Sequence, residues 1–463
     1  MKLQKPLFYF LFSLAYSLVL VIISISISYQ WISAEIGILP YSGILLLLYF
    51  LYLFLFLIPS KYFQEFLYYF LFVGILCRLL LSVSMPLWED DWARYLWEGN
   101  LVRLGISPYT TPPEYFFTDF SYSVFGDKEM EILSRINHPD WSAIYSPLVL
   151  LYFYICAILK PMSLTVLKMG YIGMDLLVVW MISCLRNKKS AVLYFLFPVL
   201  LKEVYINSHF EMISIFLCIA SIYFQKKSHI NYSSFFYGLA VHSKLYLLII
   251  FPFFLIRNTI DFKNQKIIWK AIFPFIAYFL IGIALPVVIF ELVVQNNSVF
   301  GLDSLLKFTN EFEFNSIYFY LLKLLFNFET AKKLVLILLS IVSIYSVLKY
   351  EKYFVNFNNG IVWCYTVFLF SLLFSPIVNS WYFLLIVPLY FITNIRLPNI
   401  LLIVLLLQLS YLTKVNLKLE ENLYRGFYTL EESIVFLEIG CITITILLTI
   451  LSRKKKPSAK SNG

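Results

Sequence analysis

The chain has 463 residues, of which 61% are hydrophobic and 19% aromatic, while only 14% are charged. A soluble fold of this length cannot bury so much apolar surface, so the composition excludes a soluble globular protein and predicts a polytopic membrane protein. The net charge of +9 comes from short basic clusters between apolar runs. That pattern is typical of cytoplasmic loops and does not indicate a nucleic-acid partner.

The apolar runs show no residue-by-residue alternation, so they predict helices rather than a β-barrel. At ~20 residues per crossing we expect one all-α domain over 1–463 with roughly 11–13 transmembrane helices. The first run is too long for a signal peptide and is predicted to stay as an uncleaved helix. The predicted spans are roughly 7–28, 42–58, 65–85, 144–159, 164–185, 190–206, 210–225, 233–256, 269–294, 330–349, 361–374, 382–395, 399–413 and 433–452.

Basic residues set the expected orientation. Lys2 and Lys5 place the N-terminus inside, so 86–143 becomes the first large outer loop and 453–463 a basic cytoplasmic tail. One inconsistency remains between 143 and 186. Residue 143 is expected outside and residue 186 inside, so one or three crossings must separate them, but two apolar segments are counted. Either 144–159 is re-entrant or a boundary is misplaced.

Three polar interruptions of the apolar runs map to the same outer side as the 86–143 loop. They are KEVYINSHFE at 202–211, HSK at 242–244 and NSW at 379–381. Ionisable groups cost about 2.5–3.5 kcal/mol each at membrane depth on insertion scales, so they usually face a protein interior or a cavity. We therefore expect a single outward-facing polar site.

The acids Glu89, Asp90 and Asp91 stand at the N-terminus of a predicted helix over 89–104. They are consistent with helix capping and with an Asp90–Arg94 pair. They are equally consistent with a carboxylate that acts as general base toward a hydroxyl. The four histidines form no HxH or HxxxH pair and the six cysteines no CxxC, so we expect no metal and no cofactor.

Five segments, taken in order, resemble the motifs of bacterial integral-membrane mannosyltransferases of the GT-C superfamily, near glycosyltransferase family 87 and the mannosyltransferase of GPI-anchor assembly. DDWARYLWEGNLVRLGISPY at 90–109 is similar to DD-x-x-RY-x-WDG-x(5)-G-I-N-P-Y, and INHP with IYSP at 136–147 to INHP with IYPP. KEVYINSHFE is similar to KE-x-x-x-NGHxD, GLAVHSKLY at 238–246 to GLAVLTKLYP, and SPIVNSWYFLLIVPL at 375–389 to SPxxxPWYLLWLLPL. The chain departs from these motifs at Glu98, Ser107, Ser146, Ser208, Glu211, Asn379 and Ser380.

This resemblance implies a GT-C fold and a glycosyltransferase in the cell (inner) membrane, with its active site on the non-cytoplasmic face. The donor would be a polyprenyl-phosphate sugar, with mannose the expected hexose, and the acceptor a glycan or glycolipid hydroxyl. The family's catalytic acid falls on Asp90, with Asp91 as second choice, and the reaction would invert the anomeric carbon. The expected substrate-binding residues are Arg94, Tyr95, His138, Tyr145, Lys202, Glu203, Asn207, His209, Glu211, Lys244 and Trp381.

Several of these residues also have a purely structural interpretation in place of substrate binding. His138 is also typical of a turn, and 202–211 of a buried hydrogen-bond network. Lys244 is expected to bind the donor phosphate, although a lysine there can also snorkel, as can Lys202. Trp381 is interfacial or stacks on a sugar.

Two rival functions remain open. A secondary transporter would carry internal repeats with matching broken helices, and the sequence shows neither. A non-catalytic lipid-binding protein of the same fold is the second rival, and retention of Asp90, Asp91 and Lys244 argues against it.

Overall fold

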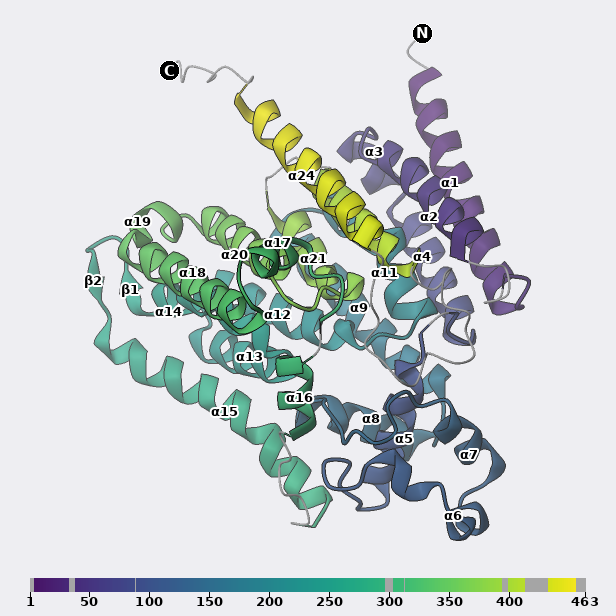
Figure 1. The fold of residues 1–463 in the computed structure, drawn as a ribbon. Coiled ribbons are helices and arrows are strands. Elements are labelled where there is room, and N and C mark those ends of the chain that lie inside the picture. Colours follow the sequence, from purple (N-terminus) through teal and green to yellow (C-terminus); the bar gives the residue numbers. More distant parts are fainter. Residues whose placement is uncertain are drawn as a thin grey trace, which may run out of the picture.

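The computed structural model describes residues 4–32, 38–87, 89–295, 303–311, 313–393, 399–412 and 432–454. Within these residues the fold is all-α, as predicted, apart from one two-stranded hairpin, β1 (Ile260–Asp261) with β2 (Lys266–Ile267). The strands are antiparallel, and Ile260 pairs with Ile267 and Asp261 with Lys266. Figure 1 shows the helices gathered around a central bundle, with the hairpin at its edge. The predicted basic tail at 453–463 lies almost entirely outside the described residues.

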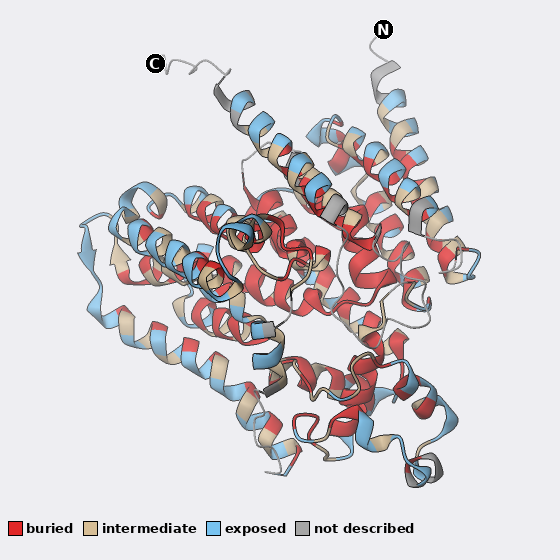
Figure 2. Ribbon diagram, in the orientation of Figure 1, coloured by how far each residue is buried: buried red, intermediate tan, exposed pale blue. Residues whose placement is uncertain are grey.

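Four described helices are long and apolar enough to cross a membrane: α1 (Gln4–Ser28), α9 (Leu164–Leu185), α15 (Trp269–Val293) and α18 (Phe328–Leu348). The outer surfaces of α15 and α18 carry many exposed leucine, isoleucine and phenylalanine side chains. Figure 2 shows these two helices with exposed residues along most of their length. Such surfaces are stable against lipid rather than water, so the chain is a helical membrane protein.

Other predicted spans form helices whose apolar part is shorter. They include α2 (Ile38–Leu55), α4 (Leu67–Ser82), α8 (Pro147–Leu159), α20 (Phe357–Leu373) and α24 (Glu432–Lys454). With 13 residues, α8 is about 20 Å long, whereas the hydrocarbon core of a bilayer is about 30 Å thick. Since α8 is too short to cross alone, its length favours the re-entrant alternative for 144–159.

Four spans predicted as continuous are broken in the structure, which corrects the prediction. The elements at these breaks are α10 (Lys188–Phe195), α11 (Pro198–Leu200), the π-helical turn η3 (Leu201–Ile206), α13 (Ile230–Ser243), η4 (Leu245–Ile250), α14 (Phe251–Thr259), η5 (Ser380–Leu385), α21 (Ile386–Ile392), α22 (Asn399–Leu406) and η6 (Leu407–Leu412). Pro198 has no amide to donate, and Lys244 adopts an extended conformation at φ −149° and ψ 107°. At each break the backbone leaves the regular α-helical hydrogen-bond pattern, which is tolerated at membrane depth only where the segment is buried in protein or lines a cavity.

The 86–143 segment folds into short helices beneath the bundle. They are α5 (Asp91–Arg103), η2 (Pro113–Phe116), α6 (Asp119–Val124) and α7 (Asp127–Ser134). The helix predicted at 89–104 therefore begins two residues later, at Asp91. α5 is largely buried and packs against α8, where a Cβ on Gly99 would lie 2.6 Å from the carbonyl oxygen of Phe153. This close contact fixes the acidic start of α5 to the bundle.

The remaining helices complete the fold. They are α3 (Ser60–Glu65), α12 (Glu211–Lys226), α16 (Asp303–Glu311), α17 (Ile317–Leu325) and α19 (Tyr350–Tyr353).

An ion pair buried between α4 and α9 was not foreseen from the sequence. Arg78 and Asp175 lie 2.7 Å apart, and both side chains are fully buried. Arg78 also donates to the carbonyl oxygens of Gly74 and Phe195, and Tyr205 donates to Asp175. Because a buried charge is tolerated only when it is paired and hydrogen-bonded, this cluster joins the two helices specifically.

Candidate active site

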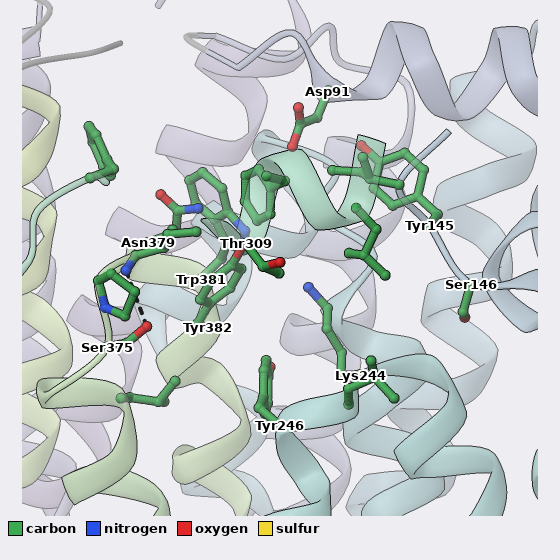
Figure 3. Close-up of a pocket in the computed structure, with 18 of the residues that line it drawn as sticks. Asp91, Tyr145, Ser146, Lys244, Tyr246, Thr309, Ser375, Asn379, Trp381 and Tyr382 are labelled. Carbon is green, nitrogen blue, oxygen red and sulfur yellow. Dashed lines mark hydrogen bonds between the residues drawn. The ribbon is translucent and has the colours of Figure 1, made fainter. Parts of the chain in front are cut away.

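A cavity of about 930 Å³ lies where the breaks in the bundle meet the start of α5. Its wall combines α5, the 137–146 segment, the break at Lys244, α16 to α18, η5 and η6. Figure 3 shows Asp91 at one end of this cavity and Tyr246 at the other, with Lys244 between them. Four of the sequence motifs, far apart in the chain, therefore meet around one space, and the KEVYINSHFE motif adds Phe210.

The end of the cavity near α5 is acidic, since Glu89, Asp90 and Asp91 all line it. Asp90 is the N-cap residue of α5, but its side chain makes no capping hydrogen bond. Instead, the side-chain amide of Asn137 donates to Asp90 Oδ1 at 2.9 Å. The carboxylate of Asp90 is thus oriented by a partner from the 137–146 segment while it borders the cavity.

Asp91 begins α5 and also borders the cavity. The Tyr95 hydroxyl donates to Asp91 Oδ2 over a long 3.5 Å, so the two residues share a helix face as predicted. Loss of solvation, together with the negative charges of Asp90 and Glu89, raises the pKa of Asp91 to about 7. Such a pKa suits a group that exchanges a proton near neutral pH.

Arg94 lines the cavity but is fully engaged by protein groups. Its guanidinium pairs with Glu98 at 2.9 Å and donates to the carbonyl oxygens of Asn137, His138 and Trp141. His138 has a φ of +45°, so this turn needs external support. Arg94 therefore holds the segment that carries Asn137, and through it orients Asp90.

His138 and Tyr145 also line the cavity. The His138 ring lies against Trp141, with ring centroids 4.9 Å apart. Loss of solvation lowers the pKa of His138, which favours the neutral ring. Tyr95, by contrast, is buried against Tyr145, with ring centroids 5.3 Å apart, and supports the cavity wall from behind.

Lys244 is the cation at the centre of the cavity. Its Nζ lies 2.8 Å from Glu211 Oε1 and sits over the rings of Phe210 and Tyr382 at 4.3 and 4.7 Å. Its side chain is 14% exposed, and Figure 3 shows it pointing toward the end of the cavity where Asp91 lies. Glu211 itself is buried and borders Lys244 rather than the cavity.

The 202–209 part of the KEVYINSHFE motif lies behind the wall. Lys202, Glu203, Asn207 and His209 are buried, and none of them lines the cavity among the described residues. Glu203 accepts hydrogen bonds from Lys202 and Asn207, and Lys202 Nζ lies 3.2 Å from the ring centroid of Tyr411. This placement favours the hydrogen-bond network over direct substrate contact.

The other side of the cavity is apolar. It is lined by Leu305, Phe308, Phe319, Val335, Leu336, Leu339, Leu372, Phe374 and Ile377. Lys332 of α18 donates to the Thr309 carbonyl at 3.0 Å and to Asn310 Oδ1 at 2.7 Å, which ties α16 to α18. The cavity is therefore amphiphilic, with carboxylates at one end, Lys244 at its centre and an apolar arm along its other side.

Sequence reasoning missed several residues of the wall. Five of them lie within recognised motifs and were detectable by that position alone, namely Asn137, His242, Tyr246, Ser375 and Tyr382. Tyr411 carries no local signal, because only the fold brings it to the cavity.

Among the described residues, no group of three or more histidine, cysteine or acidic side chains is arranged to hold a metal ion. No known protein family, curated protein or solved structure matches this chain.

Proposed function

We propose that this membrane protein is a GT-C glycosyltransferase. It moves a hexose, with mannose the expected sugar, from a polyprenyl-phosphate donor to the hydroxyl of a lipid- or glycan-linked acceptor on the non-cytoplasmic face. The observation that carries the proposal is the cavity itself, since it joins the carboxylates of Asp90 and Asp91 to Lys244 and to an apolar arm.

The shape and chemistry of the cavity match an amphiphilic donor. The apolar arm between α16, α17 and α18 suits an isoprenoid chain, since its side chains are as apolar as the lipid that the chain leaves. The phosphate then lies near Lys244, where it competes with Glu211 for the ammonium group. One central lysine matches the charge of a phosphate monoester better than that of a diphosphate, so a monophosphate-linked sugar is the favoured donor class.

The proposed reaction is a single displacement at the anomeric carbon. Asp90, oriented by Asn137, accepts the proton of the acceptor hydroxyl as that oxygen bonds to the carbon. The bond between the carbon and the phosphate oxygen breaks at the same time, and the lipid phosphate leaves with the electron pair. Lys244 stabilises the charge that develops on this leaving group, so no strong general acid is needed. Asp91 is the second candidate for the base.

The test is transfer from radiolabelled polyprenyl-phosphate mannose in membranes that contain the wild type or Asp90→Asn. Asparagine keeps the size of the side chain and removes the base. Asp127→Asn, an exposed acid at the start of α7, is the matched control. We expect transfer by the wild type and the control, and loss in Asp90→Asn at equal protein level. Polyprenyl-phosphate glucose and aminosugar donors extend the panel, and no transfer from any of them would favour a transporter or a non-catalytic lipid-binding protein.

A further inference from the structure

The carboxylate of Glu203 is the centre of a buried network that the proposed reaction does not use. Oε1 accepts from Lys202 Nζ at 2.9 Å and from Ser380 Oγ at 2.7 Å. Oε2 accepts from Asn207 Nδ2 and from the Tyr411 hydroxyl, each at 3.1 Å. Glu203 is completely buried, so these donors replace the water that a carboxylate needs.

This network connects three of the breaks in the bundle. Glu203 belongs to the π-helical turn η3, Ser380 begins η5 and Tyr411 belongs to η6. π-helical turns often occur at functional sites, because they aim side chains that a regular helix would turn away. Here the turn places one carboxylate where it holds two segments of the cavity wall.

The residue next to Ser380 is Trp381, and the same network supports it. The His209 ring stacks on the Trp381 indole, with centroids 3.8 Å apart and an interplanar angle of 18°. His209 Nε2 lies 3.6 Å from Glu203 Oε2. Glu203 therefore lies beside both residues that fix the indole, namely the preceding serine and the histidine stacked against it.

His209 stacks on one face of the indole and is completely buried, whereas Trp381 is partly exposed and lines the cavity. The Tyr382 ring stands at 87° to the indole, so it does not stack on the indole as His209 does. In Figure 3, Trp381 lies to one side of Lys244, at the level between Lys244 and Asp91.

We propose that the face of Trp381 opposite His209 is the platform on which the pyranose ring of the donor packs, and that Glu203 is a positioning residue that holds this platform through His209 and Ser380. A pyranose carries apolar C–H groups on its faces and hydroxyls at its rim, so a flat aromatic ring buries the face without removing water from the hydroxyls. This inference rests on the proposed function, since it places the sugar between the phosphate at Lys244 and the carboxylates at α5.

The test measures binding to the purified full chain in detergent. The two ligands are a short-chain polyprenyl-phosphate mannose and the same lipid phosphate without the sugar. We expect the wild type to bind the sugar-bearing ligand more tightly. Trp381→Ala should weaken that ligand about tenfold and leave the bare lipid phosphate unchanged. Trp180→Ala, an exposed tryptophan on α9, is the control.

Glu203→Gln should show the same selective loss to a smaller extent. It should add no further loss in the Glu203→Gln, Trp381→Ala double variant, because the platform is already gone. If Glu203→Gln does not fold, His209→Ala removes the stacked support and gives the same comparison. A purely structural role predicts equal weakening of both ligands and additive losses, which would overturn the positioning role of Glu203.

The two ligands separate failure of this inference from failure of the proposed function. Equal affinity of the wild type for both ligands would reject the platform while leaving a lipid-phosphate site in place. No binding of either ligand would reject the proposed donor class, and the platform with it.

Discussion

The side-chain amide of Asn137 donates a hydrogen bond to Oδ1 of Asp90 at 2.9 Å, although the two residues are 47 positions apart. The backbone carbonyl of Asn137 in turn accepts from Arg94, one turn after Asp90 on α5. This closed arrangement restricts the orientation of the Asp90 carboxylate at the edge of the cavity. It makes the orientation of the proposed base depend on a residue that has no titratable group.

Asn137→Ala should therefore lower the turnover rate with little change in the KM for the donor. A misaligned base costs on the order of ten- to a hundredfold in rate, because proton transfer requires hydrogen-bond geometry. Asn358→Ala, an exposed asparagine in α20, should leave the rate unchanged. Initial rates over a range of donor concentrations give both parameters, and a change in KM alone would place Asn137 in donor binding instead.

Lys244→Met should weaken binding of the lipid-phosphate donor, since it removes the central cation of the cavity. The single substitution also leaves the buried Glu211 without its ion-pair partner, which destabilises the fold. Lys244→Met with Glu211→Gln removes both charges and restores neutrality. We expect the double variant to recover thermal stability but not donor affinity. Recovery of both would assign Lys244 a structural role.

The pKa of Asp91, raised to about 7, makes a pH dependence measurable if Asp91 takes part in proton transfer. A raised carboxyl pKa means that the protonated form dominates below pH 7 and the charged form above it. A base must be charged, so transfer should rise with pH through about 7. Asp91→Asn should lack this rise in whatever transfer it retains, and a wild-type rate that stays constant between pH 6 and 8 would show that ionisation of Asp91 does not limit transfer.

The Arg78–Asp175 pair should be essential for stability and irrelevant to chemistry, since it lies between α4 and α9. Arg78→Met leaves a buried carboxylate unpaired, which costs about 3–5 kcal/mol. Arg78→Met with Asp175→Asn removes both charges and should recover much of the loss. Thermal unfolding in detergent measures both variants, and equal stability of the single and double variants would argue against the ion pair as the stabilising interaction.

The sequence predicted the membrane class, the helical fold and part of the site. Asp90, Asp91, Lys244 and Trp381 do line one cavity, because polar residues within apolar runs need an interior to face. Lys202 and Glu203 also face the protein interior, but they do so within a buried hydrogen-bond network rather than at the cavity. Their partners, Ser380 and Tyr411, lie about 180 and 210 positions away along the chain, and no sequence pattern reveals the pairing.

Two further features were beyond reach of the sequence for physical reasons. The leucines and phenylalanines of the apolar arm, such as Leu336 and Phe374, are indistinguishable in sequence from side chains that face lipid. Arg78 and Asp175 stand singly within apolar runs, and only the packing of α4 on α9 makes them a pair. Both features depend on helix packing rather than on helix composition.

The central claim is that Asp90 acts as base in sugar transfer within this cavity. The most direct measurement is the single-turnover rate of mannose transfer from bound polyprenyl-phosphate mannose, compared between the wild type and Asp90→Asn at saturating donor. The account predicts a rate that falls by about a hundredfold or more, with donor binding unchanged. An unchanged rate in Asp90→Asn would contradict it and move the base to Asp91 or elsewhere.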